Sequence, residues 1–392
     1  MKIRKINLLL QIVIAITLGI ACGNIFNEGF TRVFVTFNSL FSNFLNLMIP
    51  FIILGLVIPG IARLGTGSGK MLLTTVLLSY GFTILAGCFS LVVCRLTYPL
   101  VLGQSALMHI DAAPELKSYF NISIPPVLDV MSALVISFIL GIGLSTIKGD
   151  TLLRAAEDFK EIIELTLRKV IIPLLPLYIF GIFLVITFNG QVVSVLGVFI
   201  KIILIIFAIT FSYLVIQFSI AGWVAHKNPF KMLGVMLTAY VTALGTQSSA
   251  ATIPVTLGQA YKLGIRKEVA DFVIPLCATI HLSGSTMKIV AYSLAVMMMM
   301  GTPFDAGQFM GFILLLGVTM VAAPGVPGGA IMAALGLLQL TFGFDSTAIA
   351  MMIALYMATD SFGTATNVTG DGSIAVIVDT LKTKSDNNNP KK

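Results

Sequence analysis

The sequence predicts an all-α polytopic membrane protein, and three observations support that class. The 392 residues are 57% hydrophobic and 10% charged, with a mean hydropathy of +1.00, whereas soluble domains carry about 25% charged residues. Apolar runs of roughly 20 residues, long enough to cross a bilayer as helices, recur along the chain. Most of the Lys and Arg residues lie in the short segments between these runs and at the ends. A lipid bilayer is therefore the first predicted partner.

The composition also argues against several other classes. The formal net charge of +7 does not indicate nucleic-acid binding, because the basic residues are spread over loops and termini. All four cysteines lie within apolar runs, which argues against a disulfide framework. With three histidines and no Cys/His cluster, a structural zinc site is not expected.

Eight apolar runs predict membrane-spanning helices. The first follows basic residues at positions 2–5, a pattern that also begins cleaved signal peptides, but the many later spans favour a retained helix. The polar segment 103–124 predicts an outer loop. Alternating acids, bases and aliphatics over 149–165 predict an amphipathic helix that leads into the fifth span. The predicted spans are 7–26, 34–62, 71–97, 125–147, 166–188, 193–222, 269–299 and 346–379.

Two further apolar segments, 229–262 and 306–343, are interrupted at their centres by small and helix-breaking residues. The first break is Gly245-Thr-Gln-Ser-Ser-Ala-Ala-Thr-Ile-Pro254, and the second is Ala322-Ala-Pro-Gly-Val-Pro-Gly-Gly329. Non-helical backbone survives at membrane depth only where protein or a watery cavity satisfies it. Paired breaks of this kind predict two re-entrant helical hairpins whose tips meet at a site.

The distribution of basic residues predicts the orientation. Most of them fall on one side of the spans, whereas the opposite loops hold little beyond Arg32 and Lys117. By the positive-inside rule, both termini are cytoplasmic in a cell (inner) membrane. The first hairpin then enters from the cytoplasm and the second from outside, an inverted pair. The segment 381–392, rich in Asn and Lys, predicts a disordered cytoplasmic tail.

Polar residues in the last span predict a ligand track. Asp360, Thr364, Asn367 and Asp371 fall at i, i+4, i+7 and i+11, which is one face of a helix. Carboxylates are expensive inside a membrane and therefore indicate function. The alternative is a helix end that leaves the membrane with its acids solvated. The apolar run that resumes after Asp371 favours the track.

A second polar stretch runs from Ala278 to Lys288. If it is helical, His281, Ser285 and Lys288 share one face, but Gly284 also permits local unwinding. A buried histidine is commonly a satisfied core residue. A lysine at this depth requires a carboxylate partner, and Asp360 is the candidate.

The two hairpin breaks carry chemistry of their own. Hydroxyls and free backbone N–H groups at Thr246–Ser249 suit the binding of an anion. The alternative is that these small residues only allow close packing of helices. Carbonyl groups exposed at Pro324–Gly329 suit a hard cation such as Na⁺, and the glycines would let this tip move as a gate.

At these residues the chain resembles the dicarboxylate/amino acid:cation symporter family, the group of the glutamate transporters. Thr246–Val255 resembles the serine-rich first hairpin of that family, and Ala278–Ser285 resembles its unwound Ala-Thr-Ile-Asn-Met-Asp-Gly-Thr segment. Gly325-Val-Pro-Gly matches the second hairpin tip. Asp360–Asp371, ending in Asn-Val-Thr-Gly-Asp, matches the last helix. The resemblance is clear over 225–380 and rests on span pattern alone before that.

The resemblance implies a homotrimer that works as an elevator-type transporter. Residues 1–70 and 103–190 would form scaffold helices 1–2 and 4–5 with the outer loop. Residues 71–102 (helix 3) and 191–380 would form the mobile transport domain, which includes helices 6–8 and both hairpins.

The resemblance also implies ligand roles. Asp360 would hold a substrate amino group, and Ser249, Thr364 and Asn367 would hold the carboxylate of an amino acid. Asp371 and Asn367 with the carbonyl of Cys277 would bind one sodium ion. The full implied substrate set is Gln247, Ser248, Ser249, Ser285, Lys288, Val326, Gly329, Asp360, Gly363, Thr364 and Asn367. Thr279 with second-hairpin carbonyls near Met320, Val321 and Ala323 would form another sodium site. The full implied cation set is Cys277, Thr279, His281, Met320, Val321, Ala323, Asn367 and Asp371.

Departures from the family pattern bear on substrate and ion. His281 and Ser283 replace the Asn and Asp of the unwound motif, so a third sodium site is lost or altered. Gly363 stands where acidic-substrate members place an arginine, and this loss of the guanidinium fork favours a small neutral amino acid. Lys288 leaves two hypotheses open: it replaces that arginine for an acidic ligand, or it neutralises Asp360 when the site is empty.

The coupling ion and two other classes of protein also stay open. Asp371, Asn367 and Thr279 favour sodium, whereas a histidine titrating near neutral pH would suit proton coupling. An intramembrane hydrolase would use Ser248 or Ser249 with His281, but the sequence lacks a nucleophile-elbow pattern. A passive channel would not accumulate substrate. A sodium-coupled symporter of a small amino acid is the preferred hypothesis, with no catalytic residues predicted.

Overall fold

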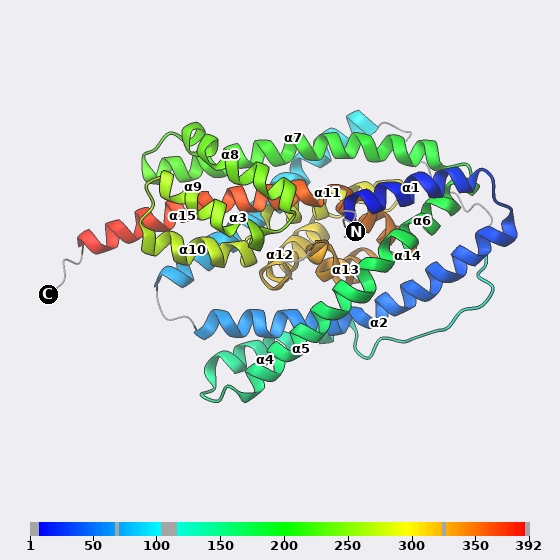
Figure 1. The fold of residues 1–392 in the computed structure, drawn as a ribbon, viewed down its shortest axis with the longest axis horizontal. Coiled ribbons are helices and arrows are strands. Elements are labelled where there is room, and N and C mark those ends of the chain that lie inside the picture. The colour runs from blue at the N-terminus through cyan, green and yellow to red at the C-terminus, as the bar shows by residue number, and fades with distance from the viewer. Residues whose placement is uncertain (1–7, 67–69, 103–115, 324–326, 389–392) are drawn as a thin grey trace, which may run out of the picture.

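The computed structural model describes residues 8–66, 70–102, 116–323 and 327–388, and all regular structure in these ranges is helical (Figure 1). In chain order the elements are α1 (Leu8–Gly23), α2 (Glu28–Thr66), α3 (Lys70–Leu102), α4 (Val130–Thr146), α5 (Thr151–Thr166), the π-helical turn η2 (Leu167–Ile171), α6 (Ile172–Phe188), α7 (Val192–Ala225), α8 (Pro229–Thr246), α9 (Ser249–Lys262), α10 (Lys267–Ile280), α11 (Ser283–Met299), α12 (Ala306–Ala322), α13 (Gly329–Phe342), α14 (Ser346–Ala358) and α15 (Asp360–Asn388).

Five helical segments of the described chain are long and apolar enough to cross a membrane, and the bent pair α14–α15 makes up to six. The five are Glu28–Ala62, Lys70–Leu102, Thr151–Phe188, Val192–Ala225 and Lys267–Met299. The expected spans at 7–26 and 125–147 correspond to α1 and α4, which are shorter, with 16 and 17 residues. The amphipathic helix expected at 149–165 is confirmed as α5, which continues through η2 into α6.

Local chemistry sets where α4 begins. Pro125 and Pro126 lack backbone donors, and the helix starts only after Asp129. The side chain of Asp129 accepts hydrogen bonds from the backbone N–H and the hydroxyl of Ser132, at 2.9 and 2.6 Å. These bonds favour the ionised cap and hold the pKa of Asp129 below its ordinary value. The predicted start at 125 was therefore five residues early.

The two interrupted segments each form a helical hairpin. In the first hairpin, α8–α9, the chain reverses at Gln247, whose φ is +54°, and the Ser248 hydroxyl caps α9 by accepting from the Ala251 N–H. In the second hairpin, α12–α13, Gly328 has a φ of +73° immediately before α13. Residues 324–326 at its tip, including the expected substrate residue Val326, lie outside the described residues.

Two other helices are broken. α10 ends at Ile280 and α11 starts at Ser283, so the alternative of local unwinding is correct and His281 does not share a helix with Lys288. α14 and α15 meet at an angle of 61° beside Thr359, a break that the apolar pattern did not predict. α15 also continues to Asn388, so the expected disordered tail is helical over 381–388, while 389–392 lie outside the described residues.

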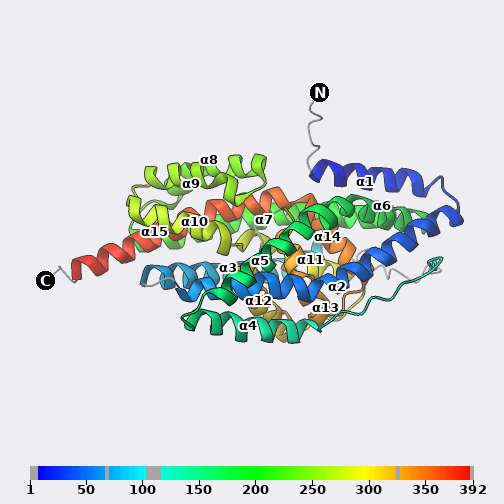
Figure 2. The ribbon, with the colours of Figure 1, turned by 60° about the horizontal axis from the view of Figure 1, so that its bottom comes forward.

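The helices pack in two groups (Figures 1 and 2). Helices α1, α2, α4, α5 and α6 pack mainly on one another, whereas α3 and α7–α15 pack mainly on one another. Glycines permit close approach in the first group: a Cβ at Gly19 of α1 would lie 2.7 Å from the Phe180 carbonyl of α6. In the second group, α3 donates hydrogen bonds to α11, from Ser90 to the Met287 carbonyl and from Tyr98 to the Ala291 carbonyl. The second hairpin packs against α2 and so joins the groups.

Candidate functional site

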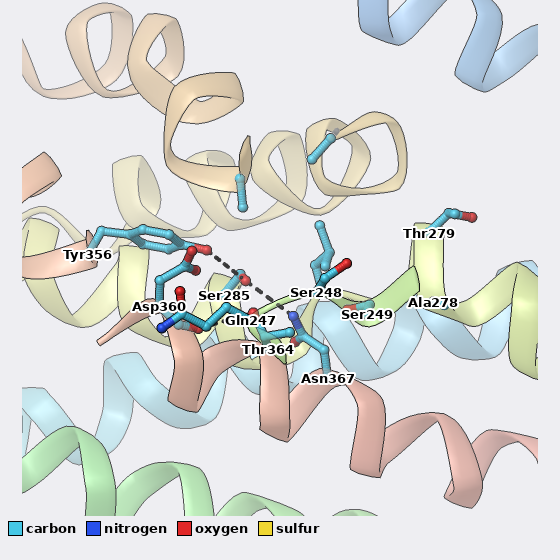
Figure 3. A pocket seen from close by; sticks show the side chains of 13 residues that line it. Gln247, Ser248, Ser249, Ala278, Thr279, Ser285, Tyr356, Asp360, Thr364 and Asn367 are labelled. Atoms are coloured by element: carbon cyan, nitrogen blue, oxygen red, sulfur yellow. Dashed lines mark hydrogen bonds between the residues drawn. The ribbon is translucent and has the colours of Figure 1, made fainter. Parts of the chain in front are cut away.

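A polar pocket lies where the tips of both hairpins approach the breaks in α10–α11 and α14–α15 (Figure 3). Hairpin tips and helix breaks leave backbone N–H and C=O groups without helical partners, so this is where the fold can offer them to a ligand. The described residues that line the pocket are Gln247, Ser248, Ser249, Ala278, Thr279, Leu282, Ser285, Ala323, Ala330, Tyr356, Asp360, Thr364 and Asn367.

Most of the predicted substrate residues meet in this pocket. The serine-rich tip, Ser285 and three members of the α15 track line it, as do Thr279 and Ala323 from the predicted cation set. Four lining residues were missed: Ala278, Leu282, Ala330 and Tyr356. Tyr356 precedes Asp360 by four residues, but in an apolar run it carried no signal of function.

The polar track on α15 forms one wall of the pocket (Figure 3). Asp360 stands in the first turn of α15, where the helix dipole favours a carboxylate. The Ser285 hydroxyl on α11 connects this track to α14. Its oxygen accepts from the Asn367 amide at 3.3 Å and from the Tyr356 hydroxyl at 2.9 Å. Asp371 lies further along the track, and it is buried outside the described pocket lining.

Asp360 connects the pocket to the second hairpin. One of its carboxylate oxygens accepts a hydrogen bond from the Gly328 N–H at 2.8 Å. The other lies 3.8 Å from the ammonium nitrogen of Lys288, so the predicted partnership of these two side chains is confirmed. The Asp360 side chain is 13% exposed, whereas that of Lys288 is fully buried. The carboxylate therefore faces the pocket and the ammonium lies behind it.

Lys288 occupies the space beside Gly363. A Cβ at Gly363 would lie 2.6 Å from the Lys288 Nζ and 2.5 Å from its Cε. The ammonium donates to the Thr359 carbonyl at 3.1 Å and lies 3.9 Å from the centre of the Tyr356 ring. Neither Lys288 nor Gly363 is among the described lining residues, and Gly329 is not either.

His281 and Asp371 form a second buried pair. The imidazole Nδ1 lies 2.9 Å from a carboxylate oxygen of Asp371, and both side chains are at most 1% exposed. The other imidazole nitrogen lies 3.3 Å from the amide nitrogen of Gln217 on α7. Gln217 was missed, although a glutamine within a long apolar run is itself an unusual signal.

The expected sodium ligands around Asp371 are already engaged by protein donors. The Cys277 carbonyl accepts from the His281 backbone N–H at 2.8 Å, and the Asn367 side-chain oxygen accepts from the Gly284 N–H at 2.7 Å. Because the His281 Nδ1 lies beside one carboxylate oxygen of Asp371, all three members of the implied site already have a nitrogen partner. This arrangement departs from an open sodium site.

The second expected cation set remains compatible with a hard cation. Thr279 and Ala323 line the same pocket, while Met320 and Val321 stand in the last turn of α12. The Met320 carbonyl accepts from the Ala323 N–H at 3.2 Å and keeps a second lone pair for a cation. Oxygen donors of this kind suit Na⁺, whereas transition metals prefer clusters of thiolate and imidazole ligands. No group of three or more His, Cys, Asp or Glu side chains gathers in the part of the chain that the structure describes.

The contacts of His281 also decide against the hydrolase alternative. Its two ring nitrogens face Asp371 and Gln217, and the Ser248 hydroxyl serves as the cap of α9. A serine nucleophile requires a base within hydrogen-bond reach, and His281 is committed elsewhere.

A bundle of apolar helices whose hairpin tips and helix breaks enclose a polar pocket defines a membrane transporter. The model of the Sodium:dicarboxylate symporter family matches residues 8–381, so the chain belongs to that family of cation-coupled symporters. It is a multi-pass membrane protein of a transporter family and not an enzyme.

Two of the similar proteins match most of the chain, and a third matches a shorter part of it. It is 26% identical over 391 residues to a Serine/threonine transporter SstT of Acinetobacter baumannii (strain AYE), covering 96% of this chain and 97% of the relative. A Serine/threonine transporter SstT of Acinetobacter baylyi is 26% identical over 401 residues, with the same coverage. Excitatory amino acid transporter 2 of Homo sapiens is 34% identical over 156 residues, which cover 40% of this chain and 27% of that protein.

Proposed function

We propose that this protein is a secondary active symporter that carries a small neutral amino acid into the cell together with sodium. The observation that carries the proposal is the polarity of the pocket: it presents the Asp360 carboxylate but no described cationic side chain. Such a pocket suits a substrate with an ammonium group and no second carboxylate.

The two ends of the pocket suit the two ends of an amino acid. Asp360 would pair with the substrate ammonium group. Ser249 with Thr364 and Asn367 would hold the carboxylate, helped by the N–H groups at the start of α9, where the helix dipole favours anions. The relatives described as serine/threonine transporters support a small substrate, and a hydroxyl-bearing side chain could bond to the remaining polar groups.

The position of Lys288 favours a neutral over an acidic substrate. It fills the space beside Gly363, but its side chain is fully buried behind Asp360. An ammonium in this place neutralises Asp360 and does not reach a substrate carboxylate in the pocket. An acidic amino acid or dicarboxylate substrate held by Lys288 is the alternative, and the assay below separates the two.

We infer an elevator mechanism in which the second packing group moves against the first. The scaffold would comprise 1–70 and 103–190, and the transport domain 71–102 and 191–380. The separate packing of these groups supports the division. In this proposal the chain has eight spans, cytoplasmic termini and two re-entrant hairpins. The hairpins have inverted orientation because α10–α11, which connects them, crosses the membrane and so places their bases on opposite sides. A homotrimer follows from the family resemblance.

Uptake into proteoliposomes tests the proposal. With an inward sodium gradient, labelled serine, threonine or alanine should accumulate, and replacement of sodium by choline should abolish accumulation. Asp360→Asn should lower uptake about 10- to 100-fold, because a charged hydrogen bond to the ammonium is lost. Asp345→Asn is the matched control, since Asp345 caps α14 and Asn caps helices equally well.

Three results would contradict parts of the proposal. Preferential accumulation of aspartate would favour the Lys288 alternative. Uptake that ignores sodium but collapses with the proton gradient would establish proton coupling. Equilibration without accumulation would indicate a channel.

A further inference from the structure

We propose that the buried side chain of His281 takes the place of a coupling sodium ion beside Asp371, so that sodium binds only on the Thr279 side of the pocket. This inference rests on the proposed sodium symport and specifies its ion sites. It concerns the surroundings of Asp371, where the contacts of the side chains do not fit the sodium site that the family resemblance implies.

The Asp371 carboxylate already has the partner that its burial demands. A buried carboxylate without a partner is strongly destabilising, so some donor or cation must face it. In this chain the partner is the His281 Nδ1, 2.9 Å from the carboxylate oxygen, with both side chains buried. Because the Gln217 amide nitrogen can only donate to the other ring nitrogen, the tautomer that fits both contacts carries its proton on Nδ1 and donates to Asp371. The chain thus supplies from its own sequence what a bound ion would otherwise supply.

The neighbouring oxygens are engaged in the same way. The carbonyl of Cys277 accepts from the His281 N–H, and the side-chain oxygen of Asn367 accepts from the Gly284 N–H. A sodium ion would need several oxygens facing one point. Here the Cys277 carbonyl and the Asn367 side-chain oxygen each accept from a backbone N–H, and one Asp371 oxygen faces the imidazole.

The imidazole is held in a close-fitting place. A Cβ at Gly370 would lie 2.7 Å from the His281 Cε1 and 2.7 Å from the Gln217 Oε1, so ring and amide both press on the backbone of α15. Gln217 also contacts the second ring nitrogen at 3.3 Å. The buried ring is thus held by contacts with α7 and α15.

His281→Asn tests the inference, because it replaces the ring by a shorter side chain that ends in an oxygen. For the wild type we expect sodium-dependent uptake with a Hill coefficient of about 1, and for the variant a value that rises toward about 2, since the Hill coefficient is limited by the number of sites. Sodium should also raise the thermal unfolding temperature more in the variant than in the wild type, because a second bound ion adds stabilisation.

The matched control is His226→Asn. His226 is exposed at the end of α7 with a φ of +54°, a conformation that asparagine tolerates. This variant should keep the sodium response of the wild type. Equal Hill coefficients and equal sodium-induced thermal shifts in the wild type and a folded His281→Asn variant would overturn the inference.

Asp371→Asn provides a second test if His281→Asn does not fold. Without sodium at Asp371, the half-saturating sodium concentration should change less than about twofold, whatever happens to turnover. A direct sodium ligand would instead lose affinity by about tenfold or more, as seen when metal-site groups are removed, and that result would refute the inference. Whether wild-type uptake depends on sodium tests the proposed function. The inference is tested separately, by the difference between the variants and the wild type.

Discussion

At the scale of single residues, Gly363 and Lys288 must be considered together. The sequence showed the missing side chain at 363 and the unexpected lysine as two separate departures. The structure shows that they are one feature, because the lysine side chain stands where a side chain at 363 would begin. A side chain introduced at position 363 therefore has room only when the side chain at position 288 is shortened.

This coupling predicts the outcome of restoring the arginine. Gly363→Arg alone should impair uptake and yield, since its Cβ would lie 2.5 Å from the Lys288 Cε. Lys288→Ala/Gly363→Arg should recover folding and shift the aspartate-to-serine uptake ratio by about tenfold or more, because a guanidinium matches a carboxylate.

Substrate competition in proteoliposomes measures that ratio. Lys288→Ala alone is the control, and it should not shift preference toward aspartate. A Gly363→Arg single variant with normal yield and unchanged selectivity would show that the space is not shared.

At the scale of elements, the tip of the second hairpin depends on Gly328. Its φ of +73° costs a non-glycine residue about 1–2 kcal/mol, and a Cβ there would also lie 2.6 Å from the Met357 sulfur. Gly343 ends the same hairpin with a φ of +66° but has open space around it. Comparing alanine substitutions at these two glycines therefore distinguishes the effect of backbone strain, which both share, from the effect of the contact with Met357, which only Gly328 has.

We predict that Gly328→Ala lowers uptake strongly, whereas Gly343→Ala lowers only stability, by about 1–2 kcal/mol from the strained backbone. Thermal unfolding and initial uptake rates, measured on both variants, check this. Equal uptake by the two variants would mean that the close contact with Met357 has no role in transport.

Element type was predictable where residue chemistry interrupted an apolar run. Pro254 and the Pro-Gly pairs near residue 325 marked both hairpins, and the one-face spacing from Asp360 to Asn367 placed three pocket residues correctly. The bend at Thr359 was missed because threonine is compatible with a helix. The pairing of His281 with Asp371 was missed because it joins positions 90 residues apart, which no local pattern records.

At the scale of the whole molecule, the contact between the two packing groups is where an elevator would slide. A Cβ at Gly60 of α2 would lie 3.1 Å from the Cβ of Ala322 in the last turn of α12. This separation is close to the range of about 3.5–4.5 Å that disulfides span. Cysteines at these positions can therefore join the groups covalently once the two backbones move apart by a few tenths of an ångström.

We predict that oxidised Gly60→Cys/Ala322→Cys loses uptake and that a reductant restores it. The single variants, treated with the same oxidant, are the controls for the native cysteines. Undiminished uptake by a fully cross-linked protein would rule out relative motion at this contact.

The hydrogen bond between Asp360 and the Gly328 N–H has a consequence for how the protein cycles. The carboxylate that would receive a substrate accepts from the N–H at the hairpin tip and faces Lys288. In a transport cycle these two contacts would close the tip and balance the charge of Asp360 once the substrate has left, and these are the conditions under which a carrier can return empty. Net uptake should then run at a rate comparable to exchange. Lys288→Ala should slow net uptake while sparing exchange between labelled and unlabelled substrate.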